Sequence, residues 1–213
     1  MKTRRAKTLA VLAIVVLISG LALAGLALAA DDAFKFMPKG GRELLLEVKA
    51  KCANCDDLVT LVTTKRSADD WQKYFTGKQS TVTGLSDAEK RKGALATFTE
   101  KQIRTLTAYL SINLPLARDQ LPRDPARAQW EAVLPVDGRK LTLDRCMGCH
   151  SLATTILISG DLNGWGVIMR KSDHVNLGMN AQQLQELLHY LAINMPVPES
   201  EIPDEFKKGT GGY

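Results

Sequence analysis

The five residues Cys146-Met147-Gly148-Cys149-His150 have a counterpart earlier in the chain, because Cys52-Ala53-Asn54-Cys55-Asp56 stands 94 residues before them. Trp71 and Trp165 keep the same offset, and each lies 19 residues after the first cysteine of its own pair. Matching order and spacing over such a length indicates an internal repeat, which has to be recognised before a fold is assigned. The sequence therefore predicts two tandem copies of one small domain.

The end of each copy is expected to be a helix. Residues 109–115 match residues 190–196 at an offset of 81, so the first copy holds 13 additional residues before this helix. Thr99 and Asn180 are good N-caps, and Gln183 would complete a capping box in the second copy. Each helix runs into a proline, which cannot continue it. The residues expected to face inward are Ile103, Leu106, Leu110 and Leu114 in the first copy, and Leu184, Leu187, Leu188 and Leu191 in the second.

No convincing run of alternating polar and apolar residues predicts a strand, so the expected fold class is all-α. The expected parts are a leader at 1–30, a degenerate domain at 31–118, a linker at 119–136, a second domain at 137–197 and a flexible tail at 198–213. The linker and the tail are rich in proline or glycine, which interrupt regular structure.

The leader combines four basic residues at positions 2–7 with an uncharged apolar run from 9 to 30, a pattern typical of an export signal. Ala27-Leu28-Ala29 offers a cleavage site, but about 20 apolar residues also suffice for a membrane anchor. Both alternatives stay open. In either case the rest of the chain is expected in the periplasm or at the outer face of the cytoplasmic membrane.

Net charge gives little help in naming a partner. The chain carries +5, of which the leader supplies four charges, so the remaining residues carry +1. They contain no dense block of Lys and Arg with interleaved aromatic residues, and nucleic-acid binding is therefore not expected.

The cysteine pairs allow three interpretations. A zinc site built from both pairs would need modules much closer together than the 90 residues that separate them. A thioredoxin-like motif would need a strand-helix-strand pattern, which the sequence does not show. The third interpretation is covalent attachment of a c-type haem at C-x-x-C-H. Cys146 and Cys149 would then form thioethers with the two vinyl groups, and His150 would be the proximal iron ligand.

Residues 137–196 resemble the class I cytochrome c family in three features: the C-x-x-C-H motif, a short helix around Trp165, and a last helix that bears Tyr190-Leu191. The resemblance implies one covalently attached haem c and one-electron transfer rather than enzymatic catalysis. It also implies a redox protein as partner, either a periplasmic dehydrogenase or a membrane electron-transfer complex. Possible membrane anchoring rests on residues 9–30.

The first copy departs from this family pattern, because Asp56 stands where the proximal His would be and the copy contains no histidine. A conventional haem is not expected there. Cys52 and Cys55 could form a disulfide in an oxidising compartment, act as a thiol-disulfide relay, or mark an unusual haem site. We expect a docking or spacing role for this copy.

The distal iron ligand has three candidates: His174, Met179 and Met169. Both Met positions correspond to phenylalanines of the first copy, Phe98 and Phe75, which suggests packing roles. His174 lies in a polar loop without a counterpart and is the leading candidate, whereas His189 is assigned no ligand role. If the site lacked a distal ligand, peroxide or gas binding would become the alternative function. A structural subunit of a respiratory complex is the third possibility.

Overall fold

The computed structural model describes residues 33–51, 55–80, 98–123, 127–174 and 177–207, so the predicted leader lies outside the described residues. The chain divides into two units, Met1–Met37 and Pro38–Tyr213. The described part of the first unit is a short turn in which the backbone N–H of Met37 donates to the carbonyl of Phe34 over 3.0 Å. Among the described helices of the whole chain, none has the length and apolarity needed to cross a membrane.

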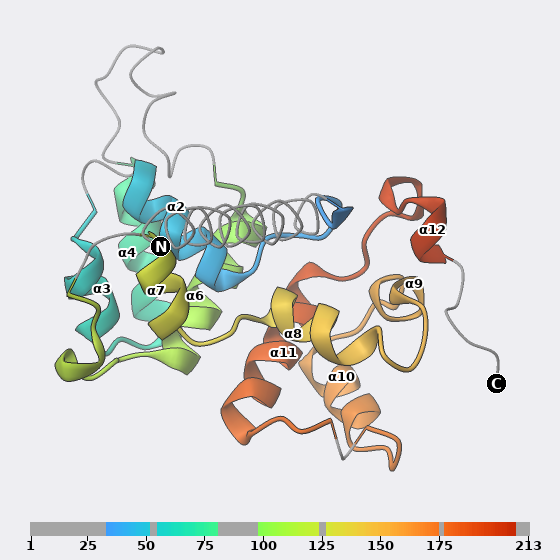
Figure 1. Ribbon diagram of the computed structural model, residues 1–213. Coiled ribbons are helices and arrows are strands. Elements are labelled where there is room, and N and C mark those ends of the chain that lie inside the picture. The colour runs from blue at the N-terminus through green and yellow to red at the C-terminus, as the bar shows by residue number, and fades with distance from the viewer. Residues whose placement is uncertain (1–32, 52–54, 81–97, 124–126, 175–176, 208–213) are drawn as a thin grey trace, which may run out of the picture. The chain divides into compact units, whose positions relative to one another are not determined.

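Helices are the only regular elements in the described ranges of the larger unit, which confirms the all-α class (Figure 1). We call residues 38–123 the first segment and residues 127–207 the second segment. The first contains α2 (Gly41–Lys51), α3 (Leu58–Thr63), α4 (Ala68–Ser80), α6 (Glu100–Asn113) and the 3-10 helix η2 (Arg118–Gln120). The second contains α7 (Arg127–Val133), α8 (Gly138–Cys146), α9 (Leu152–Ile156), α10 (Leu162–Met169), α11 (Ala181–Asn194), η3 (Glu199–Glu201) and α12 (Asp204–Lys207).

The two long helices α6 and α11 both begin with a capping box. The hydroxyl of Thr99 accepts from the backbone N–H of Gln102, whose side chain accepts in turn from the N–H of Thr99. Asn180 and Gln183 make the same reciprocal pair at the start of α11. Each capping box satisfies two backbone donors that a helix start leaves without partners. The expected N-caps are therefore confirmed.

The inward residues expected on α6 are buried, with Ile103, Leu106 and Leu110 at most 1% exposed. On α11 the expectation is wrong for Leu184 and Leu188, which are only half-buried. The reason is that α6, α8 and α10 cover another face of α11, whereas Leu184 and Leu188 each border an open hollow. That buried face contains Glu186, Leu187, Tyr190, Leu191 and Asn194.

In each segment one helix crosses closely over the long capped helix, α2 over α6 and α8 over α11. A Cβ atom on Gly41 of α2 would lie 2.1 Å from the Cβ of Tyr109 on α6. A Cβ on Gly138 of α8 would lie equally close, 2.1 Å, to the Cβ of Tyr190 on α11. Only glycine permits such an approach of two helices. The same crossing thus occurs in both segments.

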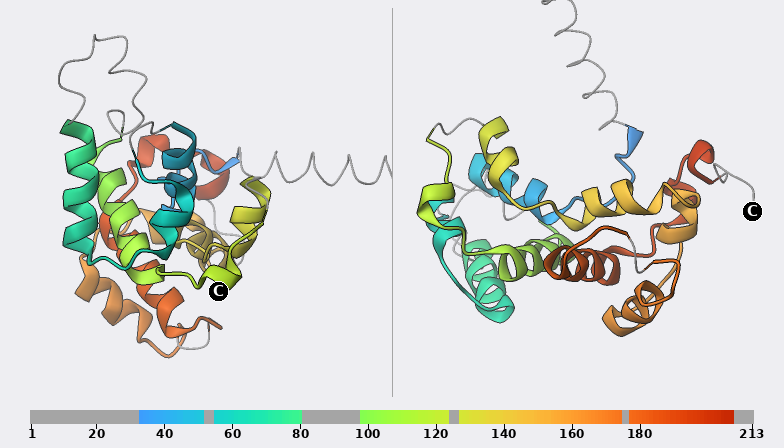
Figure 2. Two further views of the ribbon diagram at one scale, coloured as in Figure 1. Left: turned by 90° about the vertical axis from the view of Figure 1, so that its left-hand side faces the viewer. Right: turned by 60° about the horizontal axis from the view of Figure 1, so that its bottom comes forward.

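The two segments meet where α6 packs against α11 in the middle of this unit (Figure 2). The Asn113 side chain donates to the Glu186 carboxylate over 2.9 Å, and the Asn194 side chain donates to the Thr105 hydroxyl over 2.9 Å. Positions 105 and 186 correspond in the repeat, as do 113 and 194. The contact is therefore quasi-symmetric, with each helix presenting the same positions to the other.

The expected linker and the expected tail both contain helices and buried residues that their sequence did not suggest. The expected linker contains α7, and Trp130 and Leu134 belong to the same buried apolar cluster as the core of the first segment. The expected flexible tail contains η3 and α12, and Ile202 is 2% exposed. Lone aromatic or aliphatic residues among prolines and charges give no periodic pattern, which is why these contacts were not foreseen.

Candidate functional site

The C-x-x-C-H residues lie at the junction between α8 and α9. Asp137 begins α8 by accepting from the backbone N–H of Lys140 over 3.0 Å, and Cys146 is the last residue of this helix. The chain then turns, with the N–H of Cys149 donating to the carbonyl of Cys146 over 3.4 Å. Ser151 caps α9 immediately afterwards. Two helix ends therefore hold both thiols and the His150 imidazole within one short turn.

These three side chains line one cavity of about 210 Å³ in the second segment. Its remaining wall comes from the last residues of α8, from α9 and α10, from the loop before α11, and from α11 itself. The other lining residues are Arg145, Thr154, Thr155, Ile158, Trp165, Ile168, Met169, His174, Leu177 and Leu191. Two thiols and two imidazoles thus share a mainly apolar cavity.

Both histidines of the cavity are oriented by a backbone carbonyl. The Nδ1 atom of His174 lies 2.9 Å from the carbonyl oxygen of Ile168, and Nδ1 of His150 lies 3.3 Å from that of Ser151. A carbonyl can only accept, so each contact is a hydrogen bond when Nδ1 carries the proton. The lone pair is then left on Nε2, the arrangement found for metal-binding histidines.

The three distal-ligand candidates occupy different places. Met169 and His174 line the cavity that holds Cys146 and His150. Met179 does not line it, but borders an adjacent hollow of about 360 Å³ that also touches Met169 and His174. The structure therefore brings two of the candidates to the site and leaves Met179 beside it.

The Cys146 thiol is not an activated nucleophile. Burial raises its pKa to about 11, against a lowering hydrogen bond with Thr155 and with a further increase from nearby Cys149. Cys146 and Cys149 are both free thiols. A redox relay needs a stabilised thiolate, and at neutral pH Cys146 stays protonated. This gives a thioredoxin-like role no support.

The corresponding space of the first segment is filled with aromatic side chains. The rings of Trp71 and Phe75 stack with centroids 5.8 Å apart, and both residues are fully buried. The Tyr74 ring meets Phe75 edge to face at 5.0 Å. The Arg66 guanidinium lies over both Trp71 and Tyr74, at 4.5 and 4.6 Å from their centroids, and forms an ion pair with Asp56. Asp56, which stands where a proximal histidine would be, is thus engaged in an ion pair with Arg66.

Cys55 is disulfide-bonded. Its expected partner, Cys52, lies outside the described residues, so the pairing within the first C-x-x-C stays a prediction. Since a disulfide sulfur cannot form a thioether, Cys55 in this state differs chemically from the free thiols of Cys146 and Cys149.

The donor set of the second-segment cavity fits a c-type haem. Such a haem needs two thiols and one or two imidazoles rather than a cluster of charged ligands, and no group of three His, Cys, Asp or Glu in the described ranges could hold a bare metal ion. In addition, the Nε atom of Arg145 is buried at the cavity without a hydrogen-bond partner. Buried donors usually have partners, and a polar group in the cavity would supply one.

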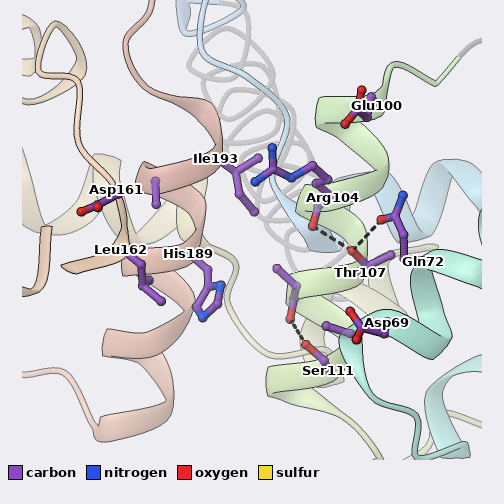
Figure 3. A pocket seen from close by; sticks show the side chains of 13 residues that line it. Asp69, Gln72, Glu100, Arg104, Thr107, Ser111, Asp161, Leu162, His189 and Ile193 are labelled. Atoms are coloured by element: carbon purple, nitrogen blue, oxygen red, sulfur yellow. Dashed lines mark hydrogen bonds between the residues drawn. The ribbon is translucent and has the colours of Figure 1, made fainter. Parts of the chain in front are cut away.

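His189 lies in a different place, a cleft of about 610 Å³ between the two segments (Figure 3). Residues of α4 and α6 form one wall of this cleft, and residues of α10 and α11 form the other. Partial burial lowers the pKa of His189. Among the described residues that border this cleft there is no cysteine, and the assignment of no ligand role to His189 stays a prediction.

Sequence reasoning missed the buried carboxyl group of Glu186, which is 2% exposed. A glutamate between apolar residues of an amphipathic helix looks like a solvent-facing position, and only the packing of α6 and α8 against α11 reveals otherwise. A signal was present in the repeat, since an uncharged Thr105 occupies the corresponding position.

No protein-family model, curated protein or solved structure matches the chain. Function must therefore be inferred from the side chains themselves.

Proposed function

We propose that this protein is an exported c-type cytochrome that carries single electrons through one haem attached to Cys146 and Cys149. The observation that carries the proposal is the single cavity bordered by both free thiols, His150 and His174. Packing alone does not explain why two thiols and two imidazoles, each oriented by a backbone carbonyl, border the same cavity.

Each residue has a defined task in this proposal. Cys146 and Cys149 anchor the haem, His150 is its proximal ligand, and His174 is its distal ligand. The bound haem supplies an iron that alternates between the ferric and ferrous states. The carbonyls of Ser151 and Ile168 keep Nδ1 protonated and Nε2 available, and apolar side chains such as Ile168 and Leu191 exclude water.

The two segments are proposed to be tandem cytochrome c-like domains, of which only the second binds haem. Support comes from the repeated glycine–tyrosine helix crossings and from the quasi-symmetric contact between α6 and α11. The first domain would be a haem-free relic that stiffens its neighbour or docks on a partner. Its aromatic interior and the Asp56–Arg66 ion pair support this role.

We further propose a location in the periplasm or at the outer face of the cytoplasmic membrane, with residues 1–30 as signal peptide or anchor. The partner would be a redox protein, either a dehydrogenase or a membrane electron-transfer complex. The alternative of peroxide or gas binding requires an open distal position. His174 at the cavity argues against an open position.

The proposal is tested by expressing the full chain with a haem-attachment system and recording oxidised and reduced spectra. We expect six-coordinate, low-spin iron in both states. His174→Ala should change the ligand-sensitive bands and the reduction potential, because the two ligands set the potential. Met179→Ala is the matched control, since Met179 lies beside the cavity, and should leave both unchanged. The reverse result would assign the distal position to Met179.

A further inference from the structure

The contact between α6 and α11 is quasi-symmetric except at one pair of positions. Thr105 on α6 and Glu186 on α11 correspond in the repeat, and each receives a hydrogen bond from an asparagine of the opposite helix. Thr105 is neutral, whereas Glu186 brings a carboxyl group into an interface where it is 2% exposed. The second segment thus carries a buried titratable group that the first lacks.

The surroundings of Glu186 contain hydrogen-bond donors but no cation. Oε1 accepts from the backbone N–H of Gly138 over 3.0 Å, and Oε2 accepts from the Asn113 side chain over 2.9 Å. Within the described part of the chain, Glu186 forms no ion pair. A buried carboxylate without a cation is costly, and proton uptake relieves that cost.

The surroundings of Glu186 increase its affinity for a proton. Burial makes the largest contribution, and repulsion by the Asp137 carboxylate at the start of α8 adds to it. The two hydrogen bonds oppose these effects, and the balance raises the pKa of Glu186 to about 8. On α6, Tyr109 feels the charge of Glu186, and its hydroxyl donates to the carbonyl of Pro135. On α2, Arg42 acts electrostatically on Tyr109, and its backbone N–H donates to Asp137. In the described ranges, α10 adds no charge that acts on Glu186.

Helix α8 connects Glu186 to the candidate haem site. Gly138, which donates to Glu186, is the first residue of α8, and Cys146 is its last. Eight residues at 1.5 Å each span about 12 Å. Over this distance, at an effective dielectric constant near 20, one unit of charge changes a pKa by about one unit.

We propose that Glu186 is a proton-binding site coupled to the haem, which takes up a proton from solvent when the iron is reduced and releases it on oxidation. This inference rests on the proposed function. Reduction adds one electron from the redox partner and removes one positive charge from the iron, so the Glu186 carboxylate is less stabilised. The proton restores the charge balance.

A polar chain leads from the surface to this site. The Gln182 side chain is exposed and donates to the Asn113 side chain over 3.0 Å, and Asn113 donates to Glu186. Two side chains, Gln182 and Asn113, therefore separate the carboxyl group from solvent, and a local opening of both would let water reach it. The proton does not have to cross the apolar core.

The test is the reduction potential of the haem-loaded full chain, measured from about pH 6 to about pH 10. We expect the potential to fall with rising pH across a window near pH 8, because reduction makes proton binding about tenfold tighter. Glu186→Gln should abolish this fall. Asp144→Asn is the matched control, since Asp144 is an exposed carboxylate on α8, the helix that connects Glu186 to the candidate haem site, and it should keep the fall.

Glu186→Thr provides a second variant, because Thr105 already occupies the corresponding position of α6. It should give the same flat profile as Glu186→Gln. An unchanged pH profile in both variants would overturn this inference and leave the proposed function intact. Absence of any reversible one-electron couple in the wild-type protein would overturn both.

Discussion

Phe75 and Met169 stand at corresponding positions, four residues after Trp71 and Trp165, yet they border different interiors. Phe75 is fully buried in a stack of aromatic rings, whereas Met169 borders a cavity lined by two thiols and two imidazoles. The helices around them follow the same order, and the closest helix crossings recur. The same order of helices can therefore surround either an interior filled with aromatic side chains or one that contains a cavity.

One of the two largest expected effects comes from emptying the filled interior. Trp71→Ala should lower the free energy of unfolding by about 3–5 kcal/mol, since truncating a buried Trp leaves a cavity. Trp165→Ala in haem-free protein should cost less, because Trp165 already borders a cavity and has fewer contacts to lose. Denaturant unfolding of the two haem-free variants measures the difference. Equal losses would mean that the two interiors are packed alike.

Glu186 should make stability depend on pH in a way that Thr105 cannot. Its pKa is raised from 4.5 to about 8, so the folded state binds a proton that the unfolded state releases. Stability should therefore fall by about 5 kcal/mol as pH rises from about 4.5 to about 8, since each pKa unit corresponds to about 1.4 kcal/mol. Glu186→Gln should remove this dependence, as followed by chemical unfolding at several pH values. If the variant keeps the wild-type slope, other groups cause it.

The smallest expected effect concerns the frame that both segments share. Gly41→Ala and Gly138→Ala each place a Cβ 2.1 Å from that of a tyrosine, so each should force a helix crossing apart. Overpacking of this kind costs about 1–3 kcal/mol. Similar losses for both variants, measured by thermal unfolding, would support a common frame. A clear loss for only one would show that the two crossings are not equivalent.

The sequence predicted the positions of the helices better than it predicted which residues are buried between them. Period and capping depend on local residues, so the helices after Thr99 and Asn180 could be placed from the sequence. Burial depends on what packs from elsewhere, so Glu186 and Trp130 were not recognised as buried. Likewise, spacing suggested His174 as a ligand candidate, but only the folded chain brings it to the cavity of Cys146 and His150.

The most direct test of the difference between the segments is the mass of the mature protein after expression with a haem-attachment system, followed by mapping of haem-bearing peptides. We expect one haem per chain, on the peptide that contains Cys146 and Cys149. We also expect the double variant Cys146→Ala with Cys149→Ala to abolish attachment, whereas Cys52→Ala with Cys55→Ala should not. A haem on the Cys52–Cys55 peptide, or none on either peptide, would contradict the assignment of the haem to the second segment alone.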